Sequence, residues 1–442
     1  MDGYSLGRSR RRVGFATVVV VGTWAVWSVA PGLPILWGPR ARAETKAAGL
    51  ALFEHEWEPH DSMAGGDGLG PVFNARSCVA CHFQGGVGGG GGNGHNVLTF
   101  EAHPTKDRPN VQAGLIHAFA VEESAREGHE ALSRLFPVVR DGARVEQGCQ
   151  IVSIDFDPIR TEKVNSTALF GAGWIDRISG KTIYQQSMRK SLARVRRELG
   201  GEFDGVAGRP RVLPDGRVGK FGWKAQFATL EEFVAAACAN EIGLGNPRME
   251  QARPLGRGAA PPVEPDLDAR QFRSLVAFVD TLSRPSEVSP GSASESERAA
   301  RGKALFTTVG CAACHTPDIG GVSGVYSDFM LHRLEVNEES KYGRGPTPEV
   351  PLPGDHPLPE EWKTPPLWGV ADSSPYFHDG GSPTLRSAIL RHKGEAGRTN
   401  EAFRALSSAD QEALLAFLNN LKAPAGARPT EAGSRKDVAL AR

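Results

Sequence analysis

Two copies of one five-residue pattern constrain this chain more than any other feature of its 442 residues. Residues 78–82 read Cys-Val-Ala-Cys-His, and residues 311–315 read Cys-Ala-Ala-Cys-His. This C-x-x-C-H spacing is typical of c-type haem attachment. On one helical turn, the two cysteines present their sulfurs to the porphyrin vinyl groups, and the histidine reaches the iron from the same face. The predicted thioether cysteines are Cys78, Cys81, Cys311 and Cys314, and the predicted iron ligands are His82 and His315.

Zinc sites, redox-active cysteine pairs and disulfides also use closely spaced cysteines. A zinc site needs four clustered ligands, and neither motif has a second C-x-x-C pair near it. A redox pair does not need the following histidine, which occurs here twice. Two covalently bound c-type haems are therefore the favoured interpretation. The sequence leaves open whether Cys149 and Cys238 pair, and whether Cys238 ligates iron.

The first 43 residues have the features of an export signal. Arg8 and residues 10–12 form a basic segment, residues 13–30 are apolar, and residues 41–43 read Ala-Arg-Ala, which fits an A-x-A cleavage site. The apolar stretch is close to the length of a membrane span, about 20 residues, so an uncleaved anchor is the alternative. With either outcome we expect a periplasmic or otherwise exported protein, which contacts a membrane only through this segment.

Composition narrows the remaining classes. The chain has 53 Gly and 31 Pro, and aromatic residues make up 7%, which indicates long loops between modest helices and disfavours a large β-sandwich or a coiled coil. Lys and Arg number 51, as do Asp and Glu. Without a basic field, nucleic acid is not an expected partner.

The surroundings of the two motifs are also duplicated. Residues 49–53 (Gly-Leu-Ala-Leu-Phe) precede the first motif, and residues 302–306 (Gly-Lys-Ala-Leu-Phe) precede the second. Each half ends in a similar apolar helix, at 276–282 and 415–421. A helix before the haem motif and a closing helix packed on it make up the small cytochrome c plan. We therefore predict a mainly α fold of two cytochrome c-like domains, with long Gly/Pro-rich loops and insertions in the first domain.

The domain boundaries follow from this duplication and from a Ser/Pro/Gly-rich linker. Residues 85–94 are nearly all glycine and are expected to form a mobile loop over the first haem. The predicted segments are 1–43 (signal peptide or N-terminal anchor), 44–285 (first cytochrome c-like domain), 286–294 (linker), 295–424 (second cytochrome c-like domain) and 425–442 (disordered tail).

A second repeat distinguishes the two haem sites. One predicted helix follows a capping box, and its counterpart is expected to begin after Ser382 as N-cap. Aligning Leu230 with Leu385 places Ala237 opposite His392 on the apolar faces. If both helices lean over their haems, the second iron gains His392 as a sixth ligand and the first iron stays open. An ordinary surface or core histidine is the alternative.

Glu241 continues the face of the first helix one turn after Ala237. A carboxyl group beside an open iron can transfer a proton to bound peroxide. A solvated carboxylate near the helix end, just before Gly243, is an equal alternative.

Several longer stretches make the chain resemble the di-haem oxidoreductase family, whose members are described as thiol oxidoreductases or peroxidases. That family is similar to bacterial di-haem cytochrome c peroxidases and to the di-haem enzyme that matures a tryptophylquinone cofactor. The stretches lie at 65–74, 168–173, 221–225, 364–369 and 375–380.

The resemblance implies roles for individual residues. In these relatives the first haem is peroxidatic and the second passes electrons, and the distal ligand of the second lies eight residues after a Thr, which here gives His392. Their distal Glu matches Glu241. Their distal Gln falls on Phe233, which is a departure from the peroxidase pattern. Trp223 lies near their inter-haem Trp, so it is a bridge candidate, with core packing as the alternative.

The favoured function is therefore an exported di-haem oxidoreductase, in which electrons pass from the second haem to a reactive first haem and reduce a small oxidant such as peroxide. The expected partners are a small electron-donor protein of cytochrome or cupredoxin type and a small-molecule oxidant or reductant. A non-catalytic di-haem electron carrier is the main alternative, and an accessory of an iron-uptake or thiol system is a third interpretation.

Overall fold

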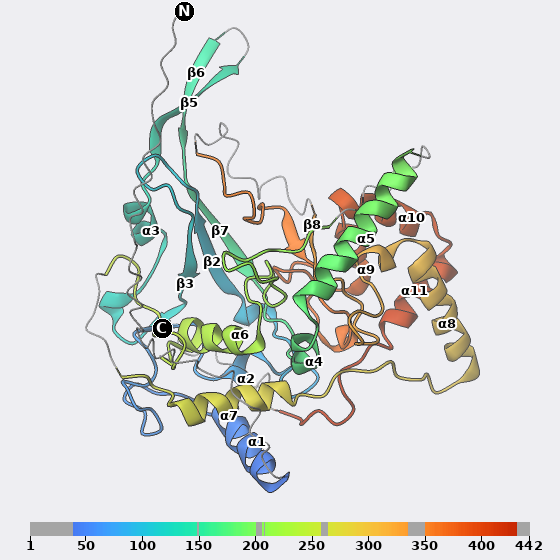
Figure 1. The fold of residues 1–442 in the computed structure, drawn as a ribbon, viewed down its shortest axis with the longest axis horizontal. Coiled ribbons are helices and arrows are strands. Elements are labelled where there is room, and N and C mark those ends of the chain that lie inside the picture. The colour runs from blue at the N-terminus through green and yellow to red at the C-terminus, as the bar shows by residue number, and fades with distance from the viewer. Residues whose placement is uncertain are drawn as a thin grey trace, which may run out of the picture. The chain divides into compact units, whose positions relative to one another are not determined.

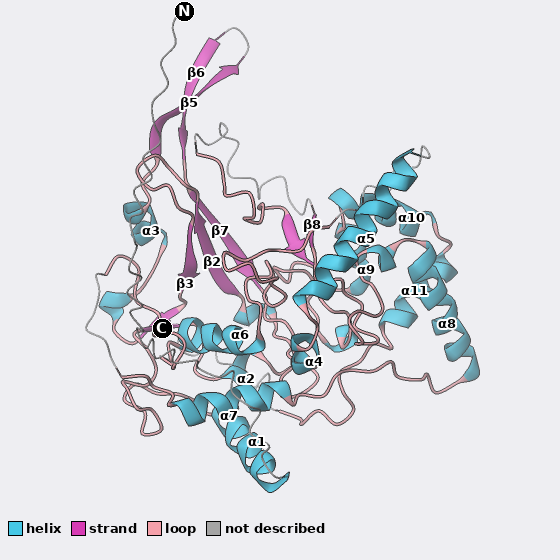
Figure 2. Cartoon of the chain, viewed as in Figure 1, coloured by secondary structure: helices cyan, strands magenta, loops and turns pink. Residues whose placement is uncertain are grey.

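The computed structural model describes residues 39–147, 150–199, 206, 208–257, 264–334 and 350–430. Residues 43–442 group as one compact unit. The structure is 37% helix and 14% strand, which confirms the predicted mainly α class (Figures 1 and 2). The division into two domains stays a prediction. Most of the predicted signal or anchor segment lies outside the described residues. No helix within those residues has the length and apolar character needed to cross a bilayer.

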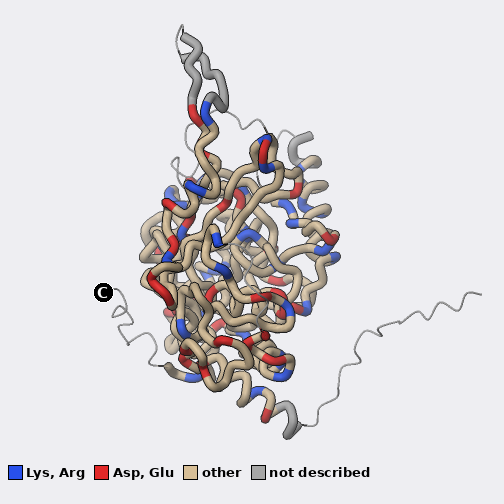
Figure 3. The backbone as a smooth tube through the Cα atoms, turned by 90° about the vertical axis from the view of Figure 1, so that its left-hand side faces the viewer, with Lys and Arg blue, Asp and Glu red and all other residues tan. Residues whose placement is uncertain are grey.

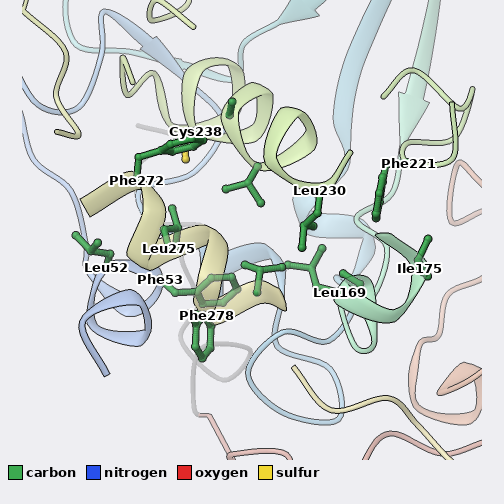
Figure 4. Close-up of a cluster of buried hydrophobic side chains, with 14 of the residues drawn as sticks. Leu52, Phe53, Leu169, Ile175, Phe221, Leu230, Cys238, Phe272, Leu275 and Phe278 are labelled. Atoms are coloured by element: carbon green, nitrogen blue, oxygen red, sulfur yellow. The ribbon is translucent and has the colours of Figure 1, made fainter. Parts of the chain in front are cut away.

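Four helices lie around the first motif and share one hydrophobic cluster. Figure 4 shows side chains of this cluster, including Phe53 of α1, Leu230 of α6 and Phe278 of α7, together with Cys238, which directly follows α6. Capping boxes at Thr229 and Asp268 satisfy the first backbone donors of two of the helices. The four are α1 (Pro39–Glu54), α2 (Cys78–Cys81), α6 (Leu230–Ala237) and α7 (Ala269–Asp280).

A second cluster surrounds the second motif and centres on Phe306, Tyr326, Phe403 and Phe417. The rings of Phe306, Tyr326 and Phe417 meet edge to face at centroid distances of 5.4 to 5.7 Å. The helices are α8 (Ala293–Thr308), η4 (Cys311–Ala313), α9 (Leu385–Arg391), α10 (Gly397–Ala405) and α11 (Ser408–Leu418).

The duplicated segments 49–53 and 302–306 each begin with a glycine that lies at a close helix crossing. A Cβ atom at Gly49 in α1 would collide with the carbonyl oxygen of Ser274 in α7, and one at Gly302 in α8 would collide with that of Ala413 in α11. Only glycine allows these close helix crossings. The helix before each motif therefore packs on the closing helix of its own half, as the cytochrome c plan predicts.

The strands form small antiparallel sheets, and those of the largest lie between residues 97 and 164 in the first half (Figure 2). That sheet has the order β3-β2-β7, and β5 and β6 form a hairpin. The strands are β1 (Val72–Phe73), β2 (Val97–Ala102), β3 (Gln112–Ile116), β4 (Phe119–Ala120), β5 (Val139–Gln147), β6 (Gln150–Phe156), β7 (Ile159–Val164), β8 (Leu331–Arg333) and β9 (Glu361–Lys363).

The remaining elements connect these groups. Figure 3 shows basic and acidic positions interspersed along the backbone on the side that it presents. The helices are α3 (His129–Leu135), α4 (Ala172–Asp176) and α5 (Gly180–Leu199); the short turns are η1 (Asn93–His95), η2 (Glu123–Ala125), η6 (Val370–Asp372) and η7 (Gly394–Ala396); η3 (Cys238–Ile242) is a π-helix.

The first part of the predicted tail contacts the first half of the chain. The backbone N–H of Val87 donates to the carbonyl of Arg428 at 2.8 Å, and the Arg428 guanidinium lies 3.1 Å from the Glu54 carboxylate. Arg428 thus links this segment to the loop after the first motif and to α1. Residues 431–442 lie outside the described part.

Candidate haem sites and the wall between them

The first motif folds as a single helical turn. Ser77 caps α2 by accepting a hydrogen bond from the N–H of Ala80 at 3.3 Å. His82 follows the turn, and its Nδ1 donates to the carbonyl of Gly89 at 3.1 Å. Burial lowers the pKa of His82 to about 4. The ring is therefore neutral at pH 7, with Nε2 left as a ligand, which is the usual arrangement of an iron-ligating histidine.

The prediction that the glycine-rich segment forms a mobile loop over the first haem is wrong, because most of the segment is packed. Residues 86–91 are buried and lie beside the His82 ring, on its proximal side. Gly88 donates its N–H to the His82 carbonyl at 2.9 Å, and Leu169 donates to the Gly88 carbonyl at 2.8 Å. A Cβ atom at Gly88 would meet the Leu282 side chain. Glycine is needed here for close packing rather than for mobility.

The distal candidates of the first site lie on α6 and on the π-helix that extends it. Ala237 is the last residue of α6, and the π-helix η3 starts with the buried Cys238. Burial raises the pKa of the Cys78 thiol, and the neighbouring Cys238 adds to the rise. Both cysteines belong to the same hydrophobic cluster. Phe233 stacks on Phe221 with centroids 5.6 Å apart. An aromatic ring therefore occupies the position that the resemblance assigns to a distal Gln.

The Glu241 carboxylate meets the chain segment just before the first motif. Asn74 donates its side-chain amide to Glu241 Oε2 at 2.9 Å, and its backbone N–H donates to the Glu241 carbonyl at 2.7 Å. Desolvation raises the pKa of Glu241, and the amide of Asn74 opposes part of that rise. The Glu241 carboxyl is therefore partly exposed and hydrogen-bonded beside the first motif, and its role as a distal acid stays a prediction.

A buried pair that sequence reasoning missed holds the π-helix in place. His117 Nε2 donates to the carbonyl of Asn240 at 2.9 Å, and His117 Nδ1 lies 2.8 Å from the Glu127 carboxylate. The two side chains are only 5% and 1% exposed. A π-helix has a wider turn than an α-helix and is frequent at functional sites. The pair fixes the residue directly before Glu241, but nothing in the local sequence signals a partner 123 residues away.

The second motif borders a cavity of about 270 Å³. His315 Nδ1 donates to the carbonyl of Tyr326 at 3.0 Å. Burial and the nearby His392 lower the pKa of His315 to about 4, so its neutral ring also offers Nε2. Cys311, Cys314, His315 and His392 all line this cavity.

His392 lies where the helix alignment predicted it, at the end of α9. Its Nδ1 donates to the carbonyl of Ala388 at 2.8 Å, and burial lowers the pKa of the ring. The helix begins at Leu385, after Thr384 as N-cap, rather than after Ser382. Ser382 is wrong as the cap because its backbone pairs with Tyr376 in a β-bridge. The alignment of Leu230 with Leu385 is unaffected, since both now follow a threonine cap.

The wall between the two motifs centres on Asn165, which the sequence did not single out. Its side chain donates to the carbonyl of Gly91 at 3.0 Å, its N–H donates to the His378 carbonyl at 2.6 Å, and its carbonyl accepts from Trp223 Nε1 at 2.8 Å. Asn165 thus joins the proximal loop of the first motif to the cavity of the second. Trp223 lines that cavity and is not a buried core residue.

Trp223 belongs to an aromatic group on this wall. His378 stacks on Trp362 with ring centroids 3.5 Å apart, and it meets Trp223 edge to face at 6.3 Å. The Nζ atom of Lys224 lies 3.6 Å from the Trp362 ring centroid. It donates to three carbonyls, including that of Glu361 at 2.6 Å. Burial lowers the pKa of His378 to about 3. The ring is therefore neutral near pH 7.

A charged cluster borders the same cavity next to Cys314, whose sulfur lies 3.5 Å from His332 Nδ1. His332 Nε2 and Nδ1 lie 2.9 Å from the carboxylates of Asp328 and Glu395, respectively. Lys190 donates to Asp328 at 2.7 Å. Both nitrogens of His332 are occupied, so this histidine is not available as an alternative iron ligand.

The residues present fit a haem at the second motif, because a cavity separates two neutral imidazoles whose Nδ1 atoms are already bonded. At the first motif, His82 is likewise a neutral imidazole whose Nδ1 donates a hydrogen bond to a backbone carbonyl. Among the described residues, no three His, Cys, Asp or Glu side chains are grouped as an ion site, and the five described cysteines form no disulfide. Cys149 lies outside the described residues, so its pairing with Cys238 is not tested.

Known proteins share parts of this chain. Residues 354–421 match the sequence model of a family described as "Di-haem oxidoreductase, putative peroxidase". A curated relative, hydrazine synthase subunit gamma of Kuenenia stuttgartiensis, is 29% identical over 161 residues, which cover 29% of this chain and 44% of the relative. The match thus spans less than half of that protein's length.

Solved structures give weaker likenesses. Hydrazine synthase of Kuenenia stuttgartiensis has a TM-score of 0.35 at 17% identity, over 59% of this chain and 72% of that one. A MauG-like protein associated with microbial copper homeostasis has a TM-score of 0.28 at 18% identity, over 52% and 75%. The diheme peroxidase BthA of Burkholderia thailandensis has a TM-score of 0.25 at 19% identity, over 36% and 55%. Because the family match contains His392 and the stretch 375–380, the predicted resemblance to the di-haem oxidoreductases is confirmed.

Proposed function

We propose that this chain is an exported di-haem c-type oxidoreductase. Haem supplies one-electron redox chemistry, and an open coordination position on its iron admits a small oxidant such as peroxide. In this proposal Cys78, Cys81 and His82 hold the reactive group, and Cys311, Cys314, His315 and His392 hold a six-coordinate relay. The observation that carries the proposal is the contrast between Ala237 and His392 at matching positions of α6 and α9.

Glu241 is the proposed proton donor. Its pKa is raised by burial, so a larger fraction of the carboxyl carries a proton near neutral pH than in water. Asn74 orients the group through Oε2, which leaves the other oxygen for an oxidant. A positioned acid of this kind contributes about 10²–10⁴-fold to a rate.

Trp223 is the proposed electronic bridge between the two sites. Its indole lines the cavity of the second motif, and its Nε1 donates a hydrogen bond to the carbonyl of Asn165. The side chain of Asn165 in turn donates to the carbonyl of Gly91, in the loop that contacts His82. Electrons are proposed to come from a small exported electron-donor protein of cytochrome or cupredoxin type. A small-molecule oxidant would be reduced at the first site.

The test is an electron paramagnetic resonance spectrum of the haem-loaded protein, followed by peroxide turnover with a small artificial electron donor. We expect one high-spin and one low-spin component. Glu241→Gln should slow turnover at least about 100-fold and leave the spectrum nearly unchanged, whereas Glu122→Gln, on the exposed surface, should match the wild type. Two low-spin haems without turnover would favour the electron carrier, for which the aromatic Phe233 in place of a Gln also argues.

A further inference from the structure

Helix α5 carries an apolar stripe that no described element covers. Tyr184, Met188, Leu192 and Val195 are 50%, 51%, 58% and 46% exposed. At 3.6 residues per turn they fall within an arc of about 80°. We call these four residues the α5 stripe. Scattered exposed apolar residues are ordinary, but a continuous row on one helix face marks an interaction surface.

The opposite face of α5 packs onto the second haem motif. Ile183 is fully buried, Gln186 donates to the hydroxyl of Thr316 at 3.1 Å, and Lys190 donates to the carbonyl of Ala313 as well as to Asp328. The stripe is therefore separated from the second motif by the thickness of one helix, about 10 Å. In Figure 1, α5 and α9 lie in the same part of the molecule.

The charges beside the stripe are positive. Lys181 and Arg189 are exposed on the same side of the helix, and the sequence of α5 has six basic residues but a single acidic one, Glu198. A two-fold contact between two copies would bring these like charges together, which disfavours a homodimer. A partner with an acidic rim complements them.

We infer that the α5 stripe is the docking surface for an acidic electron-donor protein that reduces the second haem. This inference rests on the proposed function. Tyr, Met and Arg are enriched in protein interfaces, and apolar anchors surrounded by charge give both contact and steering. Each encounter oxidises the donor's metal centre by one electron and reduces this chain by one. Two encounters, with two protons, supply what the reduction of peroxide to water needs.

The test uses the haem-loaded protein and a small mono-haem cytochrome c of net negative charge, reduced with ascorbate. Stopped-flow absorbance measures the second-order rate constant of electron transfer, and isothermal titration calorimetry measures binding. Met188→Glu and Leu192→Glu should each lower the rate constant at least about tenfold, and raising the ionic strength from about 0.01 M to about 0.5 M should lower the wild-type value similarly. Met63→Glu is the matched control, because Met63 is also exposed, at 39%, but lies beside α7, where Gln271 donates to its carbonyl.

The control outcomes separate this inference from the proposed function. Peroxide turnover with a small artificial donor should be the same in wild type, Met188→Glu and Leu192→Glu. If wild type shows no such turnover, the proposed function fails, while binding of the cytochrome still decides the docking surface. Equal rate constants for Met188→Glu and Met63→Glu would overturn the inference. So would a dimer in analytical ultracentrifugation, or binding to anionic lipid vesicles, that either α5 variant abolishes.

Discussion

Helices α6 and α9 start alike and end differently. Each follows a threonine N-cap with a capping box and has leucine at its first position. After its last helical residue, α9 turns into extended backbone at His392, with ψ of 122°, whereas α6 continues into the π-helix η3. The shared beginning fixes how each helix enters its site, and the ending decides which side chain reaches the site.

A side chain from outside the helix holds each of the two endings. Asn400 donates to the carbonyls of Leu390 and His392 at 2.8 and 2.6 Å at the end of α9. At the end of α6, His117 donates to the carbonyl of Asn240. Helix ends leave carbonyls without partners, and each half of this chain satisfies them from a different part of its own sequence.

The largest expected effect concerns attachment. Replacing both cysteines of one motif, as in the double variant Cys78→Ser/Cys81→Ser, should remove one of two covalent haems. The double variant Cys311→Ser/Cys314→Ser should remove the other. Mass spectrometry of protein made with a cytochrome c maturation system measures this. A wild-type protein with a single added haem mass would contradict the prediction of two haem sites.

Exchanging the contrasting residues should exchange the iron environments. His392→Ala should convert the second haem from low to high spin, because a methyl group cannot ligate iron. Ala237→His should give the first haem low-spin character if the two helices lean over their sites in the same way. Electron paramagnetic resonance and optical spectra report both changes. An unchanged second haem in His392→Ala would show that its ligand is another residue.

Removing the His117 side chain, which supports the π-helix, should lower the free energy of unfolding. His117→Ala leaves the buried Glu127 carboxylate without its side-chain partner, and breaking such a pair costs about 3 kcal/mol. Urea unfolding of the loaded protein measures the change. Arg126→Ala, which removes the exposed pair with Glu123, is the control and should cost less than about 1 kcal/mol. Equal losses would mean that the π-helix does not depend on the His117–Glu127 pair.

The last expected effect depends on pH and belongs to the wall between the two motifs. Because the pKa of His378 is lowered to about 3 in the folded chain, against about 6.5 in an unfolded one, the unfolded state binds more protons between these values. Stability should therefore be complete above pH 6.5 and fall as the pH drops towards about 3. Thermal unfolding between pH 7 and pH 4 should show a shallower slope in His378→Phe. An identical slope would assign the acid sensitivity to other groups.

The sequence predicted most of what is local. The C-x-x-C-H turns, the helices before each motif and the alignment of Ala237 with His392 follow from spacing, from the duplicated segments and from capping residues a few positions apart. The start of α9 was missed by two residues, because Ser382 and Thr384 are equally good cap types and only the β-bridge with Tyr376 decides between them.

What could not be predicted depends on contacts between distant segments. The glycine-rich loop is packed because Ser166, Leu169 and Arg428 bond to it, and no local signal announces these partners. The π-helix has no sequence signature of its own, and Asn165 joins three segments through one side chain and its backbone. The domain boundaries, the export and the partners stay predictions.

The hydrogen bond between Val87 and Arg428 also has a consequence for the order of assembly. It joins a residue just after the first motif to one near the end of the described chain, and the ion pair with Glu54 ties α1 into the same place. Contacts of such long sequence separation form late in folding. The proximal side of the first motif is therefore completed only after Arg428 has joined the fold, and we expect Cys78 and Cys81 to stay accessible for haem attachment until then.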